Sequence, residues 1–167
     1  MQGKRVKESS ILLAQVMNPQ DANPAGNVHG GAIMKLIDTA AGAAAVKHSR
    51  SNCVTASIDR LDFHHPVFIG DMVTLKAGVT YTGKSSMEVG VRVESQNLLT
   101  GEIRHTVSAY MTFVALDKNG RPTAIPPLIL ETADELRRNR EAQSRRETRL
   151  REKTKEKACQ LNAESCD

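Results

Sequence analysis

The sequence predicts an α+β domain in which one antiparallel sheet wraps around one long central helix. Residues 26–46, GNVHGGAIMKLIDTAAGAAAV, combine a glycine-rich turn with apolar or alanine residues at the spacing of a helical face. After this stretch the hydrophobic period changes to two, in four long segments that are each bounded by a turn signal. One helix followed by four such strands buries its apolar surface when the sheet curls around it.

The elements follow in a simple order along the chain. The apolar run SILLAQVM, residues 10–17, predicts a first strand, and NPQDANPAGN after it predicts a loop. Because a sheet with one helix on one face leaves an edge strand and an open face, the sequence predicts a homodimer. Beyond the helix, alternation predicts four strands, near residues 53–63, 71–82, 86–97 and 104–116.

Composition divides the chain near residue 130. Residues 1–130 hold the apolar-rich part, whose core must be aliphatic because the chain has no Trp, two Tyr and three Phe. Residues 131–167 are mostly charged, with Glu141/Arg145 and Glu147/Arg151 at helical spacing. We expect a charged, solvated helix or a disordered tail there, without which the domain still folds. A role in partner binding is the alternative.

Charge and cysteine usage argue against several classes of function. The net charge is +4, and the basic residues are interleaved with acidic ones, so we expect no nucleic-acid partner. Three cysteines without CxxC spacing, and histidines without metal-ligand spacing, predict no metal site. No signal-like segment and no apolar stretch of membrane-spanning length is present, so we expect a cytoplasmic protein without a membrane partner.

Asp38 is the unusual residue of the predicted helix, because its helical neighbours are apolar or small. A carboxylate removed from water costs several kcal/mol unless it is paired or its pKa rises. One interpretation is catalytic: the glycines before the helix, Gly30 and Gly31, let a ligand approach the first-turn amides, and Asp38 supplies a base. The other is structural, with Asp38 pairing with Lys35 or with a strand hydroxyl.

Three further positions could contribute to a site. Asn27 precedes the turn and could orient a water molecule, and His29 could line the site or could pack as an ordinary turn residue. GVTYTGKS matches a phosphate-loop pattern, but its interior consists of β-forming residues and a strand follows it, so we reject that interpretation. The hairpin tip, Gly83, Lys84, Ser85 and Ser86, could still meet a phosphate at the rim of a site, or be a solvated turn.

The motif GNVHGGAIMKLIDTAAG resembles the signature of the hotdog-fold acyl-CoA thioesterases, in particular the brain-type acyl-CoA hydrolases and similar bacterial single-domain enzymes. FHHPVFIGD, TYTGKSSMEVGVRV and LLTGE resemble later strands of that family, so the resemblance covers about residues 8–126. It implies a hotdog fold, hydrolysis of fatty acyl-CoA, and homodimers that commonly assemble as trimers of dimers. No separate cofactor is implied, because coenzyme A is part of the substrate and of the product.

The resemblance also implies roles for individual residues. Asp38 of one subunit would act as general base on a water positioned by Asn27 of the other, while the Gly31 amide polarises the thioester carbonyl. Direct attack by Asp38 to give an anhydride is the second possible route. Apart from the resemblance, the residues themselves predict that His29, Gly30 and the hairpin tip contact the substrate.

Two functions of other kinds compete with the thioesterase. A non-catalytic acyl-CoA sensor would need an output module, and only about ten residues precede the first strand, too few for a DNA-binding domain. A hotdog hydratase would be expected to carry an Asp and His pair, and none lies near the helix start. Release of free thiol from acyl-CoA separates the thioesterase from both.

Overall fold

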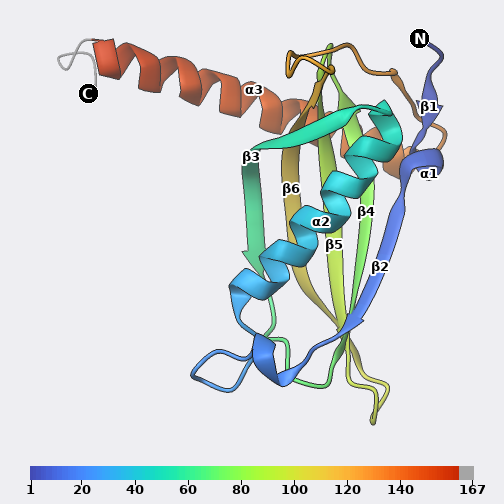
Figure 1. The fold of residues 1–167 in the computed structure, drawn as a ribbon, viewed down its shortest axis with the longest axis vertical. Coiled ribbons are helices and arrows are strands. Elements are labelled where there is room, and N and C mark those ends of the chain that lie inside the picture. The colour runs from blue at the N-terminus through green and yellow to red at the C-terminus, as the bar shows by residue number, and fades with distance from the viewer. Residues whose placement is uncertain (162–167) are drawn as a thin grey trace.

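The sheet wraps around a single long helix, as predicted (Figure 1). In the computed structural model, which describes residues 1–161, the five strands are antiparallel and lie in the order β2-β4-β5-β6-β3. The α+β fold class is therefore confirmed. The principal elements are β2 (Ile11–Val16), α2 (Gly30–Ser49), β3 (Asn52–Phe63), β4 (Met72–Thr82), β5 (Ser86–Gln96) and β6 (Ile103–Leu116).

The core lies between α2 and the concave face of the sheet. Small side chains on α2 let its backbone approach the strands, and Phe113 of β6 is the one buried aromatic side chain among the described residues. The opposite side of α2 is not covered, since Met34, Asp38 and Val46 are exposed in the single chain. Although nearly all sides of α2 carry apolar or small residues, the sheet of one chain covers only part of the helix.

The N-terminal segment is fastened to the end of α2. A two-residue parallel pair joins β1 (Lys4–Arg5) to β7 (Leu128–Ile129), and α1 (Val6–Ser9) follows β1. His48, fully buried at the end of α2, lies 3.1 Å from Ser9 Oγ through Nδ1 and 3.0 Å from the Pro126 carbonyl through Nε2. Nε2 donates to that carbonyl, and burial lowers the pKa of His48, which favours the neutral imidazole whose Nδ1 accepts from Ser9 Oγ.

Strand β3 is an edge of the sheet. It pairs with β6 alone, and two register shifts interrupt this pairing, between Thr55 and Ser57 and between Ile58 and Arg60. Val54, Ile58 and Phe63 are exposed on or beside this open edge, with 43 to 50% of their surfaces accessible. An edge with free backbone groups and exposed apolar side chains is a site for pairing with another chain.

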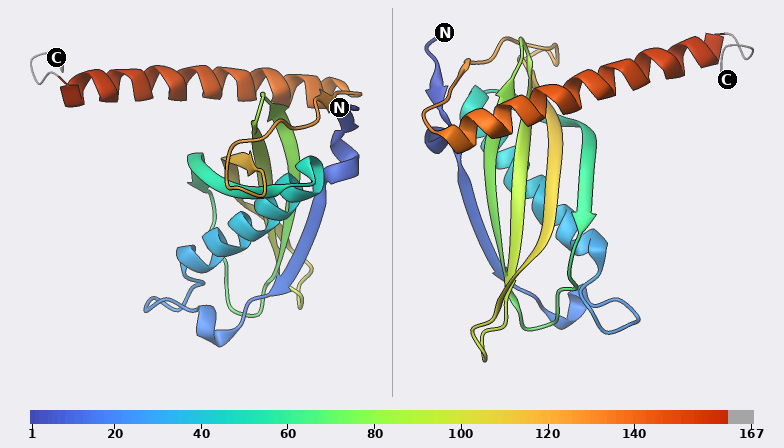
Figure 2. Two further views of the ribbon diagram at one scale, coloured as in Figure 1. Left: turned by 45° about the horizontal axis from the view of Figure 1, so that its top comes forward. Right: turned by 180° about the vertical axis from the view of Figure 1, so that it is seen from behind.

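The charged C-terminal segment forms a second long helix, α3 (Ala133–Leu161), which crosses the outer face of the sheet (Figure 2). Arg145 forms two hydrogen bonds, of 2.8 and 3.0 Å, with Glu88 of β5, and Arg149 pairs with Asp59 of β3. Both carboxylates are buried, at 3% and 8% exposure of their side chains. The segment is thus a charged and largely exposed helix, but one that docks on the sheet through these two pairs. Residues 162–167 of the predicted tail lie outside the described residues.

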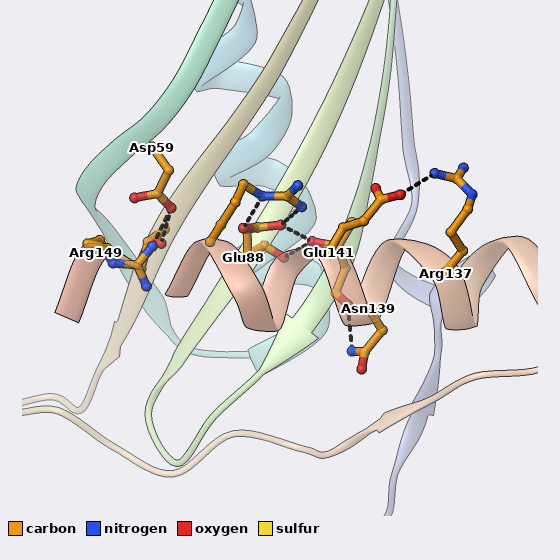
Figure 3. A network of polar contacts seen from close by, with 9 residues as sticks. Asp59, Glu88, Arg137, Asn139, Glu141 and Arg149 are labelled. Atoms are coloured by element: carbon orange, nitrogen blue, oxygen red, sulfur yellow. Dashed lines mark hydrogen bonds and ion pairs between the residues drawn. The ribbon is translucent and has the colours of Figure 1, made fainter. Parts of the chain in front are cut away.

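Burial by itself lowers the pKa of the Arg145 guanidinium, but the hydrogen bonds and charge of Glu88 outweigh it and raise the pKa above its usual value. The arginine therefore stays charged over its carboxylate, and its guanidinium also stacks 3.6 Å from the centre of the Tyr110 ring. None of the helices within residues 1–161 is long and apolar enough to cross a membrane. The polar contacts of α3 with the sheet are drawn in Figure 3.

Candidate active site

The turn before α2 is held by a dense set of backbone hydrogen bonds. Asn23 Oδ1 accepts from the amides of Ala25, at 2.9 Å, and Asn27, at 3.2 Å, while the Asn23 amide donates to the Asn27 carbonyl at 2.7 Å. Asn27 also bridges to Phe68, and the Val28 amide donates to Val67 at 2.9 Å. The turn is thereby fixed against the connection between β3 and β4, with Asn23 and Asn27 side by side in it.

His29 caps the start of α2. Its Nδ1 accepts a 2.9 Å hydrogen bond from the Gly31 amide, so the proton of the neutral ring is on Nε2. A side chain at position 31 would meet the His29 ring at 3.1 Å, which explains the glycine. The amide predicted to polarise a thioester carbonyl is thus already occupied, whereas the Gly30 amide donates to no described residue.

Asp38 lies two turns further along α2 and is paired with a strand hydroxyl. Thr55 Oγ1 of β3 donates a 2.7 Å hydrogen bond to Asp38 Oδ1, and both residues are exposed in the single chain. Among the described residues, Asp38 forms no ion pair with Lys35, and its Oδ2 accepts no hydrogen bond. One carboxylate oxygen is therefore fixed and the other is open to a ligand or to water.

Exposed apolar side chains lie beside Asp38 on α2 and near the start of that helix. Met34 precedes Asp38 by one turn of α2, and the Phe63 ring lies 3.5 Å from where a Cβ on Gly30 would be. With Phe68, they form an apolar surface whose members are 41 to 50% exposed, adjoining the open edge of β3. This arrangement offers an apolar ligand a surface beside a glycine turn and a carboxylate.

The predicted hairpin tip lies elsewhere in the chain. The turn between β4 and β5 is at the opposite end of the sheet from the start of α2 (Figure 1). Its backbone packs against the closing loop, because the carbonyls of Lys84 and Ser85 accept from Ile125, at 3.1 Å, and Ala115, at 2.9 Å. The Gly83 amide donates to Ser86 at 2.7 Å. One chain therefore groups Asn27, His29, Gly30 and Gly31 at the start of α2, with Asp38 two turns further along the helix and the tip at the other end of the sheet.

Thr55, Asn23 and Phe63 are site residues that the sequence did not reveal. Thr55 and Phe63 are ordinary members of an alternating strand, and only the packing of β3 on α2 brings them to the site. Asn23 could have been suspected, since an Asn four residues before Asn27 in a glycine-containing loop favours a side-chain turn. No group of three potential metal ligands occurs within residues 1–161.

Fold and site together define the class of protein: a hotdog domain with an acidic residue on its central helix. The Thioesterase superfamily model matches residues 25–102. The uncharacterized acyl-CoA thioester hydrolase YkhA of Bacillus subtilis is 41% identical over 130 residues, which cover 78% of this chain and 76% of YkhA. The cytosolic acyl coenzyme A thioester hydrolase of Rattus norvegicus is 36% identical over 84% of this chain, which spans only 37% of that longer protein.

Solved structures of acyl-CoA thioesterases and hydrolases are also similar to this chain. A hexameric acyl-CoA thioesterase, 39% identical, superposes with a TM-score of 0.88 over 91% of this chain and 97% of its own. The acyl-CoA hydrolase of Staphylococcus aureus, solved in complex with butyryl coenzyme A, coenzyme A and coenzyme A disulfide, is 34% identical with a TM-score of 0.86, over 93% and 94% of the two chains. The chain therefore belongs to the thioesterase superfamily, among its acyl-CoA thioester hydrolases.

Proposed function

We propose that this chain hydrolyses fatty acyl-CoA thioesters to free fatty acid and coenzyme A, with Asp38 as the general base. The observation that carries the proposal is the carboxylate itself, which is held by Thr55 through one oxygen, open at the other, and placed two turns after the glycine turn that begins the helix. The names of the relatives support the thioester as substrate.

The proposed chemistry needs one proton acceptor and one oxyanion site. Asp38 Oδ2 takes a proton from water as the water oxygen attacks the thioester carbon, and the carbonyl oxygen becomes an oxyanion. Collapse of this intermediate breaks the carbon–sulfur bond, and the proton held by Asp38 passes to the leaving thiolate. Thr55 keeps the carboxylate turned toward the water throughout.

The amides at the start of α2 are the proposed oxyanion donors. Gly30 has a free amide, and the Gly31 amide becomes available when His29 Nδ1 releases it. Because the macrodipole of α2 is positive at this end, the developing negative charge is stabilised there. His29 is then a gate on the second donor as well as a candidate contact for coenzyme A.

Asn23 is a second candidate, beside Asn27, for the asparagine that positions the water. Alanine variants of an Asn, an Asp and a Thr of the Staphylococcus aureus enzyme have been solved, and these positions lie 15 and then 17 residues apart. Asn23, Asp38 and Thr55 have the same separations here. The Asn23 side-chain nitrogen donates to no described residue, so it is free to bind water.

Comparison of matched variants separates the two asparagines. Asn23→Asp keeps the oxygen that accepts from Ala25 and Asn27 but removes the NH₂ donor, so the loop should persist while turnover falls. Asn27→Asp makes the same chemical change four residues away. A larger loss of kcat in Asn27→Asp would restore Asn27 as the positioning residue.

Two copies of the chain are part of the proposal. The exposed Asp38, the apolar surface around it and the free edge of β3 are adjacent, so pairing of two β3 edges would cover all three at once. Each site would then combine Asp38 of one subunit with the asparagine of the other. The hexameric relative supports further assembly as a trimer of dimers.

The test is release of thiol from a series of acyl-CoA substrates of increasing chain length, followed with a thiol reagent. Stoichiometric release supports hydrolysis, whereas binding without release would support a sensor, and hydration of an enoyl-CoA without thiol release a hydratase. A single turnover in ¹⁸O-labelled water distinguishes the two routes, because label in the Asp38 carboxylate requires the anhydride. We expect no separate cofactor, and a cytoplasmic location is supported by the cytosolic relatives.

A further inference from the structure

The last part of α3 extends past the edge of its own sheet. The helix crosses β4, β5, β6 and β3 in turn, and continues beyond β3 into open space (Figure 2). Its final anchor to the sheet is Arg149, which pairs with Asp59 on the edge strand. Residues 150–161 therefore form an overhang about 18 Å long, enough to cross about three strands of a neighbouring sheet.

The ion pairs of α3 all lie in the part of the helix up to Arg149, although Arg140, Arg146 and Glu147 of that part form none within the described residues. Asp134, Arg137, Arg138, Glu141 and Arg145 all form ion pairs within the helix or with the sheet. In the overhang, none of the six charged side chains forms an ion pair with a residue of the part described; they are Arg151, Glu152, Lys153, Lys155, Glu156 and Lys157. The overhang thus carries six charged side chains that have no ion-pair partner among the described residues.

The charges of the overhang follow a regular order. Residues four apart carry the same sign in all three cases, Arg151 with Lys155, Glu152 with Glu156, and Lys153 with Lys157. These like-charge pairs oppose the favourable pairs three apart, Glu152/Lys155 and Lys153/Glu156, and a short polar helix without packing is marginal. The spacing of four sorts the charges into rows, one acidic row flanked on both sides by basic rows.

The acidic row faces the edge where a second chain would arrive. Glu152 and Glu156, together with Lys153, line a groove of about 370 Å³ between α3 and β3, whose other wall includes Ile58 of the edge strand. A helix entering this groove would meet a negative row beside a positive one. The chemistry of the groove therefore favours a partner helix with basic and acidic rows of its own.

An antiparallel second copy of the overhang fits these rows. When Glu152 of one copy faces Lys157 of the other, Glu156 faces Lys153, and twofold symmetry repeats both pairs in reverse. We propose that residues 150–161 of two copies form an antiparallel helix pair that lies across the junction of the two β3 edges. This inference rests on the dimer of the proposed function, and it assigns the C-terminal helix a role in holding that dimer together.

The experiment uses the full-length protein and a zero-length carbodiimide crosslinker, which joins carboxylates and amines only when they touch. Equal amounts of ¹⁴N- and ¹⁵N-labelled chains are unfolded and refolded together, crosslinked and digested. We expect mixed-isotope peptides that join Glu152 to Lys157 or Glu156 to Lys153. A dimer whose overhang is crosslinked only within one chain, or not at all, overturns the helix pair but leaves the proposed active site intact.

Charge-reversal variants provide the matched control. Glu152→Lys with Glu156→Lys makes the overhang wholly basic, and Lys153→Glu with Lys157→Glu makes it mainly acidic, with Arg151 and Lys155 as its remaining cations. Each variant alone should lose the pair and dissociate several-fold more readily at low salt, whereas a mixture of the two should form heterodimers in preference to homodimers. No preference in the mixture contradicts the proposal. A wild-type chain that sediments as a monomer would instead overturn the proposed dimer itself.

Discussion

Thr55 Oγ1 donates a 2.7 Å hydrogen bond to Asp38 Oδ1 and so fixes one oxygen of the only carboxylate at the candidate site among the described residues. The bond joins the central helix to the edge strand of the sheet. Lys35 is therefore not the partner of Asp38, since the two residues form no ion pair.

The first prediction concerns Asp38→Asn. Asparagine can still accept from Thr55 but cannot take a proton, so kcat should fall by about a hundredfold or more. The free energy of unfolding should change by less than about 0.5 kcal/mol, because the residue is exposed and its hydrogen bond is kept. Steady-state kinetics and urea denaturation measure the two effects, with Lys35→Ala as the control. A folded Asp38→Asn enzyme with more than about a third of wild-type turnover would refute the catalytic role.

Thr55→Val tests the orienting bond separately. The substitution keeps the shape of the side chain and removes the donor, so kcat should drop by about tenfold at nearly constant KM. Thr55→Ser should restore most of the rate because it returns the hydroxyl. A valine variant that keeps wild-type turnover beside a serine variant that loses it would show that packing of the γ-methyl, and not the hydrogen bond, is what matters at this position.

Removing Arg145 should destabilise the whole domain. Arg145→Ala leaves Glu88 buried without its cation, a change that costs about 3–5 kcal/mol. Arg140→Ala, on the exposed side of the same helix, should cost less than about 0.5 kcal/mol. Urea denaturation of both variants gives the comparison. For the same reason, deleting residues 132–167 should impair folding, which reverses the expectation from the sequence alone.

The sequence predicts the strands and α2 but not the docking of α3, and this difference has a physical cause. Period-two alternation and the glycine turn place the strands and α2 within a residue or two, because the apolar side chains that determine them are adjacent in the chain. The docking of α3 depends on Glu88 and Asp59, which read as ordinary solvent-facing positions of alternating strands. Only the assembled sheet shows that both carboxylates face the same helix and need its arginines. Thr55 was hidden in the same way.

Lys84→Ala should raise KM for acyl-CoA several-fold with kcat nearly unchanged, because a rim charge on the coenzyme A phosphates acts equally on substrate and transition state. Since the tip lies at the far end of the sheet from its own helix start, this effect requires the site of another copy. Lys118→Ala, in a different exposed turn, is the control. A fall in kcat alone would exclude a phosphate contact at the tip.

Stability should depend on pH through His48. Burial, aided by the charge of Lys4, holds the pKa of His48 below its usual value of about 6.5. As the pH falls below about 6.5, His48 becomes protonated in the unfolded chain but stays neutral in the folded one. The free energy of unfolding therefore decreases. The lowered pKa of His105, caused by burial and by Arg92, adds in the same direction. His48→Gln should flatten the urea midpoint between pH 7 and 5, and an unchanged slope would contradict the assignment.

Side chains of strand β3 make contacts on both faces of the sheet within a few residues. Thr55 meets α2 on one side of the sheet, Asp59 meets Arg149 on the other, and two register shifts lie between or beside them. If Asp38 is the base we propose, selection acting on the C-terminal helix also acts on turnover, since a slip of this strand moves both contacts. Homologues that lose the arginine should carry compensating substitutions in residues 55–60, and screens for faster variants should recover mutations far from the thioester, on the opposite surface of the molecule.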